Sequence, residues 1–550
     1  MSTTQFLEVE AKYSVGADDP VPDLTKILNV HSTQATQQYE LSAIYYDTRD
    51  LRLTRSKITL RRRTGGKDDG WHLKLPDTGS GRLEISTTLG QEASAAHAPS
   101  SPIGNNTDAV PAELLSHVRA VVRDHKLIPV AQVDNLRVES TLQAEDGSAV
   151  ADFCDDRVTA WSLLPEASPE PRHWREWEFE LAESLASTKL GRQILESADE
   201  QLTTVGAVDS HSPSKLLTAL GESFALAPAP PTPLVFRKYD DRDEAFAGVL
   251  HALIATRDSL VEQDPGARRG DRRSVRTMLN AVRDLRSVLN MFTELFDHER
   301  WDNRIATASD IEAELKQLTV VLHRACDADA VAQQVHSLLD ADATELIDRQ
   351  ARQRLEHDVD SRKKRAYYRV GAALDSERYL TMLDTLDDFL ADPPLPGRME
   401  RRKATAIIVR AVKRGYMDFK NLRSSALEVF DDPEVTESEY EAHLSQMHRV
   451  AERLRTVSRV ALEFTPYDSS RLSKESKKLV DTLLEAQYSV SVCELILKRA
   501  RQAAGRGEDT FAYGLLYQAE RERSRKVLRT IDQRHRSVKS GYKRFKQSIA

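Results

Sequence analysis

The sequence predicts a multi-domain α+β protein, in which an N-terminal antiparallel β-barrel tunnel with peripheral helices precedes a C-terminal all-α double helical bundle. Hydrophobic residues alternate with polar ones up to about residue 220 and recur at helical spacing after about residue 240. Between the two regions, residues 225–233 read Ala-Leu-Ala-Pro-Ala-Pro-Pro-Thr-Pro, and such prolines favour an extended spacer. Residues 1–235 carry 22 Lys and Arg against 34 Asp and Glu, whereas residues 236–550 carry 56 against 52.

The composition indicates a soluble protein of more than one domain, with 550 residues of which 30% are charged and 40% hydrophobic. No stretch approaches the ~20 apolar residues of a membrane-spanning helix, and residues 1–15 lack the pattern of a signal peptide. Cys154, Cys326 and Cys493 lie too far apart in sequence to form a zinc motif or a disulfide framework. We therefore expect a cytoplasmic protein with no membrane partner.

The domain boundaries follow the proline-rich segment: residues 1–222 form the tunnel domain, residues 223–235 a Pro/Ala-rich linker, and residues 236–550 the helical domain. Helices are also expected in the first domain at about 112–126 and 212–220. The strand segments are FLEVEAKY, LSAIYYDT, KITLRRRT, WHLKLP, RLEIST, NLRVESTL, AVADF and REWEFEL. The helical segments are 243–263, 274–295, 310–322, 332–368, 376–390, 398–419, 439–463, 474–503 and 512–531. The break at Pro393-Pro394-Leu395-Pro396 divides them into two bundles, about 236–392 and 397–550.

Several predicted strands carry ionisable side chains on one face, since residues two apart in a strand point the same way. The faces concerned hold Glu8, Glu10 and Lys12; Arg61 and Arg63; His72 and Lys74; Arg82 and Glu84; and Glu176, Glu178 and Glu180. A sheet with one face in water explains any single strand of this kind. The exposed face of such a sheet, however, usually also contains Thr, Ser and Gln. If these faces instead line a closed barrel, carboxylates and cations alternate around a lumen that suits a polyanion and a divalent cation.

The order of the motifs resembles the CYTH, or triphosphate tunnel metalloenzyme, family over about residues 5–220. The matching motifs are Glu8-x-Glu10-x-Lys12, Tyr45-Tyr46-Asp47-Thr48, Leu60-Arg61-Arg62-Arg63, Leu73-Lys74-Leu75, Arg82 with Glu84, Arg137, Asp152, Glu178-Phe179-Glu180-Leu181 and Ser214-Lys215. The sequence departs from the family at Ser56-Lys57, where a small residue and Gly are common.

The resemblance implies a metal-dependent site with roles for individual residues. The implied ligands of Mg²⁺ or Mn²⁺ are Glu8, Glu10, Glu84, Asp152, Glu178 and Glu180. For Asp152, the alternatives Asp155 and Asp156 stay open, and Glu84 could instead orient a lysine. The implied phosphate-binding residues are Lys12, Arg61, Arg63, Lys74, Arg82, Arg137 and Lys215, and the catalytic residues are Glu8, Glu10 and Lys12.

The implied reaction is in-line attack of a metal-associated water on a terminal phosphorus. We expect inorganic triphosphate, or short polyphosphate, to be the substrate, because no aromatic or Gly-rich nucleotide pocket is recognisable in the sequence. Three alternatives stay open: hydrolysis of an organic triphosphate such as ATP or thiamine triphosphate, nucleotide cyclase activity, and a tunnel that binds polyphosphate without hydrolysing it.

The helical region places cations on single helix faces. The candidate polyphosphate-binding residues are Arg272, Arg276, Arg283, Arg286, Lys403, Arg410, Arg414, Arg453 and Arg455. Such stripes are equally explained as the solvated side of amphipathic helices. The near-neutral net charge of this region makes nucleic acid an unlikely partner.

This region resembles the CHAD domain over about residues 236–545. The resemblance is carried by Leu374-Asp375-Ser376-Glu377-Arg378-Tyr379 and Phe511-Ala512-Tyr513-Gly514-Leu515-Leu516. The family's histidine motifs match poorly: Ser445, His448 and Glu452 stand where His, Arg and Lys are expected. The resemblance implies polyphosphate binding, and scaffolding, dimerisation or shielding of the tunnel mouth are alternatives. The sequence does not define the oligomeric state.

Overall fold

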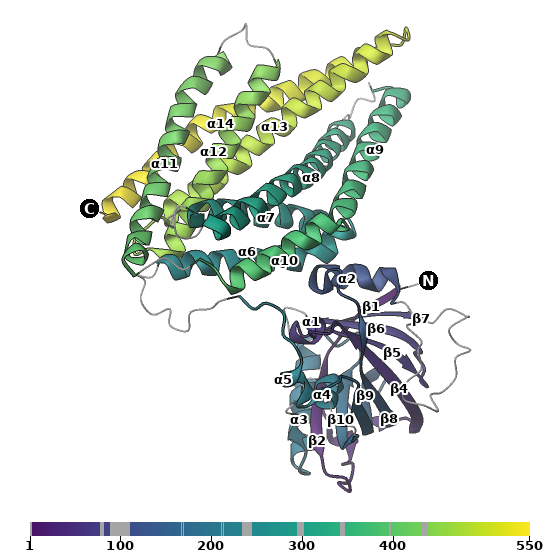
Figure 1. Ribbon diagram of the computed structural model, residues 1–550. Helices are drawn as coiled ribbons and strands as arrows, with labels where there is room; N and C mark the ends of the chain where they lie inside the picture. The colour runs from purple at the N-terminus through teal and green to yellow at the C-terminus, as the bar shows by residue number, and fades with distance from the viewer. Residues whose placement is uncertain are drawn as a thin grey trace. The chain divides into compact units, whose positions relative to one another are not determined.

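The computed structural model describes residues 3–76, 82–88, 110–166, 168, 170–210, 212, 214–233, 245–293, 302–341, 347–394, 398–431 and 437–549. The chain divides into two compact units, Met1–Pro230 and Pro231–Ala550. The first unit is rich in strands and the second is helical (Figure 1). The predicted fold class is therefore confirmed.

The first unit is built on one antiparallel sheet. Its strands run in the order β1-β7-β6-β5-β4-β8-β9-β10-β2-β11, and β3 pairs with β8. Their bounds are β1 (Thr3–Glu8), β2 (Glu10–Val15), β3 (Ser32–Thr33), β4 (Gln37–Asp47), β5 (Thr59–Thr64), β6 (Gly70–Pro76), β7 (Arg82–Thr88), β8 (Ile128–Gln143), β9 (Ala149–Ser162), β10 (Arg172–Leu181) and β11 (Val208–Asp209).

One segment of the chain brings the two ends of the sheet together. The strand predicted over FLEVEAKY is interrupted at Val9, so that β1 pairs with β7 whereas β2 pairs with β10. The Val9 carbonyl accepts a hydrogen bond from the Leu181 amide at 3.0 Å, and the Val9 side chain is buried in the apolar cluster around Trp177. Because β1 and β2 follow each other directly in the chain, the sheet curls until both ends meet on this segment.

Alternation along the strands separates an apolar outer face from a charged inner face. Outside β2 and β10, Trp177 and Phe179 pack against α3 (Lys189–Thr203). Outside β5, β6 and β7, Leu73 and Ile85 pack against α2 (Ala112–Val122). The remaining short helices near the sheet are η1 (Leu24–Lys26) and α1 (Arg52–Arg55). The helices thus cover the outer face and leave the inner face for the site.

Part of the inner face is apolar and is filled by α4 (Lys215–Leu220), which is followed by α5 (Ser223–Leu226). Leu216 of α4 packs with Ala43 and Tyr45 of β4. Ala43 and Tyr45 also line the charged cavity, so α4 occupies the interior next to that cavity.

The second unit is helical throughout its described residues. Its helices are α6 (Ala245–Arg268), α7 (Arg272–Thr293), α8 (Asp302–Asp340), α9 (Arg349–Leu374), α10 (Glu377–Ala391), α11 (Arg398–Asp431), α12 (Glu437–Phe464), α13 (Ser470–Ala504) and α14 (Phe511–Ile549). An apolar cluster containing Leu355, Leu495 and Tyr513 joins α8 and α9 to α13 and α14. Within the described ranges, no helix has the length and apolar character needed to span a bilayer.

Among the described residues of the second unit, four helices differ from the prediction: α8 is continuous across the predicted break after residue 322, α9 starts at Arg349, and α11 and α14 extend beyond residues 419 and 531. The helix expected over residues 332–368 is divided between α8 and α9. Asp348 starts α9 by accepting a hydrogen bond from the Ala351 amide at 2.8 Å, and an N-cap aspartate is a strong helix start. The last helix continues to Ile549 instead of ending at residue 531, because buried Val538 and Phe545 extend its apolar side.

In the part of the first unit that the structure describes, four helices were not expected from the sequence: the short helices η1 and α1, and two others, α3 and α5. α3 buries Ile194, Ala198 and Leu202 at a spacing of four residues, and Thr188 caps it. This signal is present in the sequence, but the helix is polar on its remaining surface. The second, α5, forms within residues 223–235, which the sequence predicts to be a linker.

Candidate active site

A charged cavity of about 330 Å³ lies inside the curled sheet. The predicted tunnel residues that line it are Glu8, Lys12, Arg61, Arg63, Lys74, Arg82, Glu84, Arg137, Asp152, Glu178, Glu180 and Lys215. Glu10 is not among the lining residues, but its carboxylate lies 3.0 Å from the Lys12 ammonium. The sheet therefore brings together side chains that are spread over the whole of the first unit.

Glu178 is held by cations from three elements. Its Oε1 accepts hydrogen bonds from the Lys12 ammonium at 2.6 Å and from the Lys215 ammonium at 2.7 Å. Its Oε2 accepts from Arg137, which also makes a two-pronged contact with Asp156 at 2.7 and 2.8 Å. Although burial opposes it, the surrounding cations hold the pKa of Glu178 well below its usual value.

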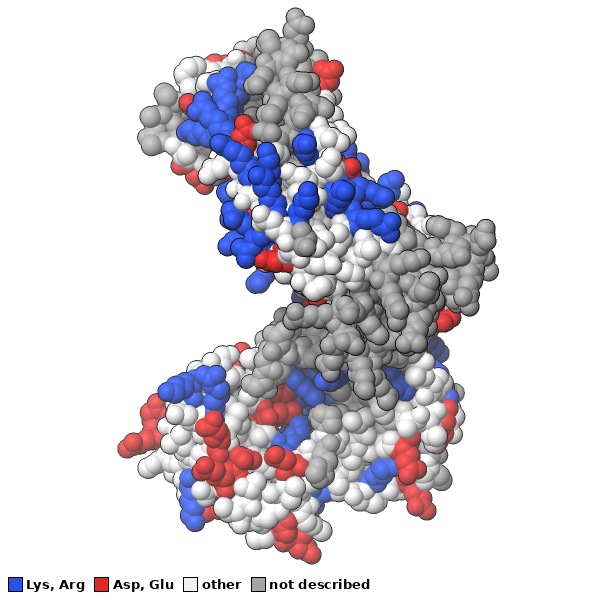
Figure 2. All heavy atoms as spheres, turned by 90° about the vertical axis from the view of Figure 1, so that its left-hand side faces the viewer, with Lys and Arg blue, Asp and Glu red and all other residues white. Residues whose placement is uncertain are grey.

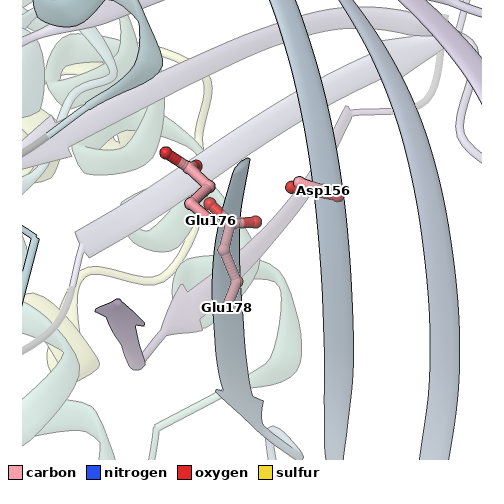
Figure 3. Close-up of side chains that lie close together, drawn as sticks. All are labelled: Asp156, Glu176 and Glu178. Atoms are coloured by element: carbon pink, nitrogen blue, oxygen red, sulfur yellow. The ribbon is translucent and has the colours of Figure 1, made fainter. Parts of the chain in front are cut away.

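Lys215 lies at the centre of a group of carboxylates. Asp156 on β9 and Glu176 and Glu178 on β10 point toward one another, with oxygen atoms within 4.8 Å (Figure 3). The Lys215 ammonium lies 2.8, 2.5 and 2.7 Å from these three carboxylates. It comes from the first position of α4, where the Ser214 side chain caps the helix. An ammonium therefore already takes the place that a metal ion would take in this group.

A second network joins Lys74, Glu84 and His72. The Lys74 ammonium lies 3.2 Å from Glu84 and also contacts Glu8. The other Glu84 oxygen lies 2.7 Å from His72 Nδ1, and His72 Nε2 lies 2.9 Å from the Asp68 carbonyl. Both oxygens of Glu84 are thus engaged. Glu84 positions Lys74 and His72 in this arrangement, rather than offering an oxygen to a metal.

The carboxylates near the β1–β2 junction carry more negative charge than their cations offset. Burial, followed by the charge of Glu8, raises the pKa of Glu180 to about 8. Burial also raises the pKa of Glu8, and Glu10 and Glu84 add to this rise while Lys74 opposes it. One oxygen of Glu8, Oε2, is buried without a hydrogen-bond partner among the described residues. This end of the cavity therefore lacks positive charge.

Arg61 and Arg63 of β5 line another part of the cavity, where Arg63 Nη2 contacts the Asp68 carboxylate. Burial, Arg61 and Arg137 lower the pKa of the Arg63 guanidinium to about 10. The Nε atoms of Arg61 and Arg63 are buried without hydrogen-bond partners in the described part of the chain. The nearest polar group to Arg61 is the Tyr45 hydroxyl, 3.4 Å from Nη1. Such guanidinium groups are suited to phosphate oxygens.

The donor set at the acidic end fits a divalent cation. Asp152 lines the cavity and lies opposite Glu180 across the β9–β10 pair. Of the alternatives to Asp152, Asp155 is bound by Arg175 at 2.8 Å, and Asp156 is bound by Arg137 and Lys215. Carboxylate oxygens are the ligands that Mg²⁺ and Mn²⁺ prefer. Glu8, Asp152 and Glu180 line this end of the cavity, but within the described ranges the one group of carboxylates with oxygens within 4.8 Å of one another is Asp156, Glu176 and Glu178.

The sequence analysis assigned no role to His72 and Glu176, and it named Asp156 only as an alternative to Asp152. His72, Asp156 and Glu176 are buried and fix the positions of Glu84, Arg137 and Lys215. His72 and Glu176 do share a charged strand face with predicted residues, and this alternation is the signal that could have found them. Tyr45 lines the cavity and lies directly opposite Arg61 across the β4–β5 pair, so the register of these two strands brings them together.

The second unit has a basic cavity of about 660 Å³ between α7, α8, α11, α12 and α13. Of the predicted polyphosphate-binding residues, Arg283, Arg286, Arg414 and Arg453 line it. Arg272 instead pairs with Asp329 at 2.5 Å, and Arg455 with Asp284 at 2.7 Å. Arg276 and Arg410 are exposed outside the cavity, and the Lys403 side chain lies outside the described residues. The sequence analysis did not select Arg449 and His323, which also line the cavity.

An exposed basic surface accompanies this cavity. Figure 2 shows Lys and Arg gathered on the side of the helical unit where α11 and the C-terminal end of α14 lie. The exposed cations of α14 that follow one face are Arg525, Arg529, Arg536, Lys539, Lys543 and Lys546. None of these six has an ion pair to another residue of the described ranges. The net charge of residues 236–550 is near zero, but this surface is locally cationic.

A curled antiparallel sheet with carboxylates and cations facing each other across an enclosed cavity defines the first unit as a triphosphate-tunnel enzyme domain. The CYTH domain model matches residues 7–199, and the CHAD domain model matches residues 251–497. "Uncharacterized protein Rv2226" of Mycobacterium tuberculosis (strain ATCC 25618 / H37Rv) is 31% identical over 558 residues, covering 97% of this chain and 98% of that protein. The chain belongs to this family, in which a CYTH domain precedes a CHAD domain.

Two solved structures are similar to parts of the chain. PptA from Streptomyces chartreusis is 14% identical with a TM-score of 0.40, and the match covers 54% of this chain and 98% of that one. The CHAD domain of the plant Ricinus communis is 16% identical with a TM-score of 0.32, and the match covers 57% of this chain and 96% of that one.

We predict that Lys215→Met destabilises the first unit by about 3–5 kcal/mol, because it leaves buried carboxylates without their shared cation. Chemical unfolding followed by tryptophan fluorescence measures this, since Trp71, Trp161, Trp174 and Trp177 of the five tryptophans lie in this unit. Lys189→Met, at an exposed position on α3, is the control and should leave the unfolding midpoint unchanged. Equal stability of the two variants would show that Lys215 does not hold this network.

Proposed function

We propose that the first unit hydrolyses inorganic triphosphate, or the end of a short polyphosphate, with the help of Mg²⁺ or Mn²⁺. The observation that carries this proposal is the separation of charge inside one cavity. Near the β1–β2 junction, burial raises the pKa of Glu180 to about 8, and Glu8 Oε2 is buried without a hydrogen-bond partner among the described residues. On β5, the Nε atoms of Arg61 and Arg63 are buried without partners in the same ranges, although Arg63 Nη2 contacts Asp68. A metal-bound triphosphate supplies the missing positive charge to the first group and the missing negative charge to the second.

The residues proposed to hold the metal are Glu8, Glu10, Asp152 and Glu180. A bound divalent cation supplies an activated water and neutralises phosphate charge. Lys12, Arg61, Arg63, Lys74, Arg82 and Arg137 are proposed to hold the phosphates. Their guanidinium and ammonium groups can fix the terminal phosphorus for in-line attack and offset the charge that develops on the leaving group.

Substrate binding is proposed to exchange partners within the tunnel. Without substrate, Lys12 is held by Glu10 and Glu178. Phosphate oxygens compete with these carboxylates for the same ammonium group. When Lys12 turns to a phosphate, Glu10 loses its cation and its carboxylate becomes available to the metal. Glu178, which three cations hold in the substrate-free tunnel, can reach a metal only in this way.

An organic triphosphate is the second candidate substrate, because Phe6 and Tyr39 line the cavity and could contact a base or a thiazole ring. The Lys67 ammonium lies 5.5 Å from the centre of the Tyr39 ring and already covers one of its faces. This contact, together with the small volume of the cavity, favours the inorganic substrate over ATP or thiamine triphosphate.

The enzyme proposal predicts phosphate release from triphosphate that depends on Mg²⁺ or Mn²⁺ and exceeds release from ATP and thiamine triphosphate. Glu10→Gln should lower kcat on the order of a hundredfold, because the variant loses a charged metal ligand. Glu145→Gln, on an exposed turn, is the matched control and should retain full activity. No turnover of any of the three substrates would leave a tunnel that only binds phosphates.

The exchange of partners predicts that Lys12→Met binds Mn²⁺ more tightly than the unaltered protein when no phosphate is present. Removing the ammonium frees Glu10, while Lys215 and Arg137 still hold Glu178, so the affinity should rise roughly tenfold. Calorimetric titration with Mn²⁺ measures this, and Lys189→Met should bind as the unaltered protein does. A weaker or unchanged affinity in Lys12→Met would contradict the exchange, but it would leave hydrolysis itself open to the substrate assay.

We also propose that the second unit binds polyphosphate through its basic cavity and the exposed surface on α14. We predict that Arg286→Gln together with Arg453→Gln weakens polyphosphate binding about tenfold and reduces its dependence on salt concentration. Arg471→Gln, exposed on α13, should change neither quantity. Unchanged binding by the double variant would show that polyphosphate does not bind in the cavity. Scaffolding would then be the role left for the cavity.

A further inference from the structure

The basic cavity of the second unit contains a carboxylate that a simple polyanion site would not hold. Five arginines line the cavity: Arg283, Arg286, Arg414, Arg449 and Arg453. Glu452 is the one acidic residue among the described residues that line it. Its Oε1 accepts a hydrogen bond from Arg283 Nη1 at 3.0 Å, and its side chain is buried.

The neighbours of Glu452 form a built site. His448 lies one turn earlier on α12, is 3% exposed and lines the cavity. Its Nε2 is buried without a hydrogen-bond partner among the described residues, so it is available to a ligand. Arg449 and Arg453 lie one turn apart near Glu452 and are exposed, and neither forms an ion pair within the part of the chain that the structure describes.

A carboxylate in such a cavity changes which anion it accepts. Two fully ionised oxygens repel each other, whereas one proton shared between them makes a strong, charge-assisted hydrogen bond. A terminal phosphate has a second pKa near 6, so it exchanges a proton around neutral pH. Sulfate and the internal phosphates of a polymer carry no such proton.

We infer that the cavity around Glu452 is a site for a phosphate group that can carry a proton, either inorganic phosphate or the terminal phosphate of a chain. Glu452 accepts the P–OH hydrogen, while Arg449, Arg453 and His448 donate to the other oxygens. Glu452 is then the specificity-determining residue. It selects phosphate over sulfate and chain ends over chain interiors.

The surroundings of Glu452 also allow the proton to come from the protein. Burial raises the pKa of Glu452, and Asp284 adds to this rise while Arg283 and Arg455 oppose it. Whichever partner brings the proton, one hydrogen lies between the carboxylate and the phosphate oxygen. Binding of a chain end at this site rests on the proposed binding of polyphosphate by the second unit. Binding of inorganic phosphate does not, and neither depends on hydrolysis in the tunnel.

The test is calorimetric titration of the full-length protein with inorganic phosphate and with sulfate at neutral pH and equal ionic strength. We expect phosphate to bind on the order of tenfold more tightly than sulfate, which corresponds to one charged hydrogen bond. Glu452→Gln should reduce this ratio to about one, since the amide can donate to sulfate. Glu463→Gln, an exposed position on the same helix, is the matched control and should keep the ratio.

A third variant guards against a folding defect in Glu452→Gln. Arg453→Gln should weaken both anions by a similar factor and leave their ratio unchanged. The tunnel is identical in all these proteins, so differences among them belong to the cavity on the second unit. Equal binding of phosphate and sulfate by the unaltered protein, or an unchanged ratio in Glu452→Gln, overturns the inference.

The outcome is separable from that of the proposed function. Long-chain polyphosphate binding without a preference for phosphate over sulfate would overturn the role of Glu452 and leave polymer binding intact. A preserved preference in a protein that hydrolyses no triphosphate would support the cavity site and contradict the tunnel reaction alone.

Discussion

The contact between Lys215 and the carboxylates of Asp156, Glu176 and Glu178 organises the interior of the first unit. Burying several carboxylates is costly unless cations lie within contact distance. Lys215 provides such a cation from α4, and Arg137 provides another from β8. The position of α4 inside the sheet is therefore tied to the charged network. Near the β1–β2 junction, Glu8 contacts Lys74 and Glu10 contacts Lys12, whereas burial raises the pKa of Glu180.

This interior is possible only because the register of the strands is fixed. On β10, Glu178 and Glu180 line the cavity and Glu176 contacts Lys215, while Trp177 and Phe179 pack beneath α3. A slip of one residue would turn the aromatic rings inward and the carboxylates into the apolar cluster. The apolar outer face thus sets the positions of the charged inner face, which binds the ligand.

In the second unit, residues that carry the family resemblance stabilise the fold. The Tyr379 hydroxyl donates to buried Asp264 at 2.9 Å, and Arg268 donates to the Leu374 carbonyl at 2.6 Å. These contacts join α6 to the α9–α10 corner. The residues that depart from the family pattern, His448 and Glu452, line the basic cavity instead. In this unit, residues that match the family pattern therefore stabilise the fold, whereas residues that depart from it line the cavity.

The sequence by itself determined the class of each unit, because period-two and helical alternation are local properties of the chain. It also indicated the inward face of the tunnel strands, since Glu8, Lys12, Arg61, Lys74 and Glu178 all follow that alternation. The sequence did not reveal α3, whose surface is mostly polar. It also did not reveal the break between α8 and α9, which the capping aspartate Asp348 marks.

Only the tertiary structure decided which charges meet. Asp152 and Asp156 share one face of β9 and Asp155 lies on the other, so alternation alone separates Asp155, which contacts Arg175. The structure then distinguishes Asp156, which contacts Arg137, from Asp152, which lines the cavity. Likewise, the sequence does not show that Glu84 contacts Lys74 and that Glu178 contacts Lys12. Pairing of charges depends on distances between strands far apart in the chain. Those distances are set by closure of the sheet and by burial, which no local pattern encodes.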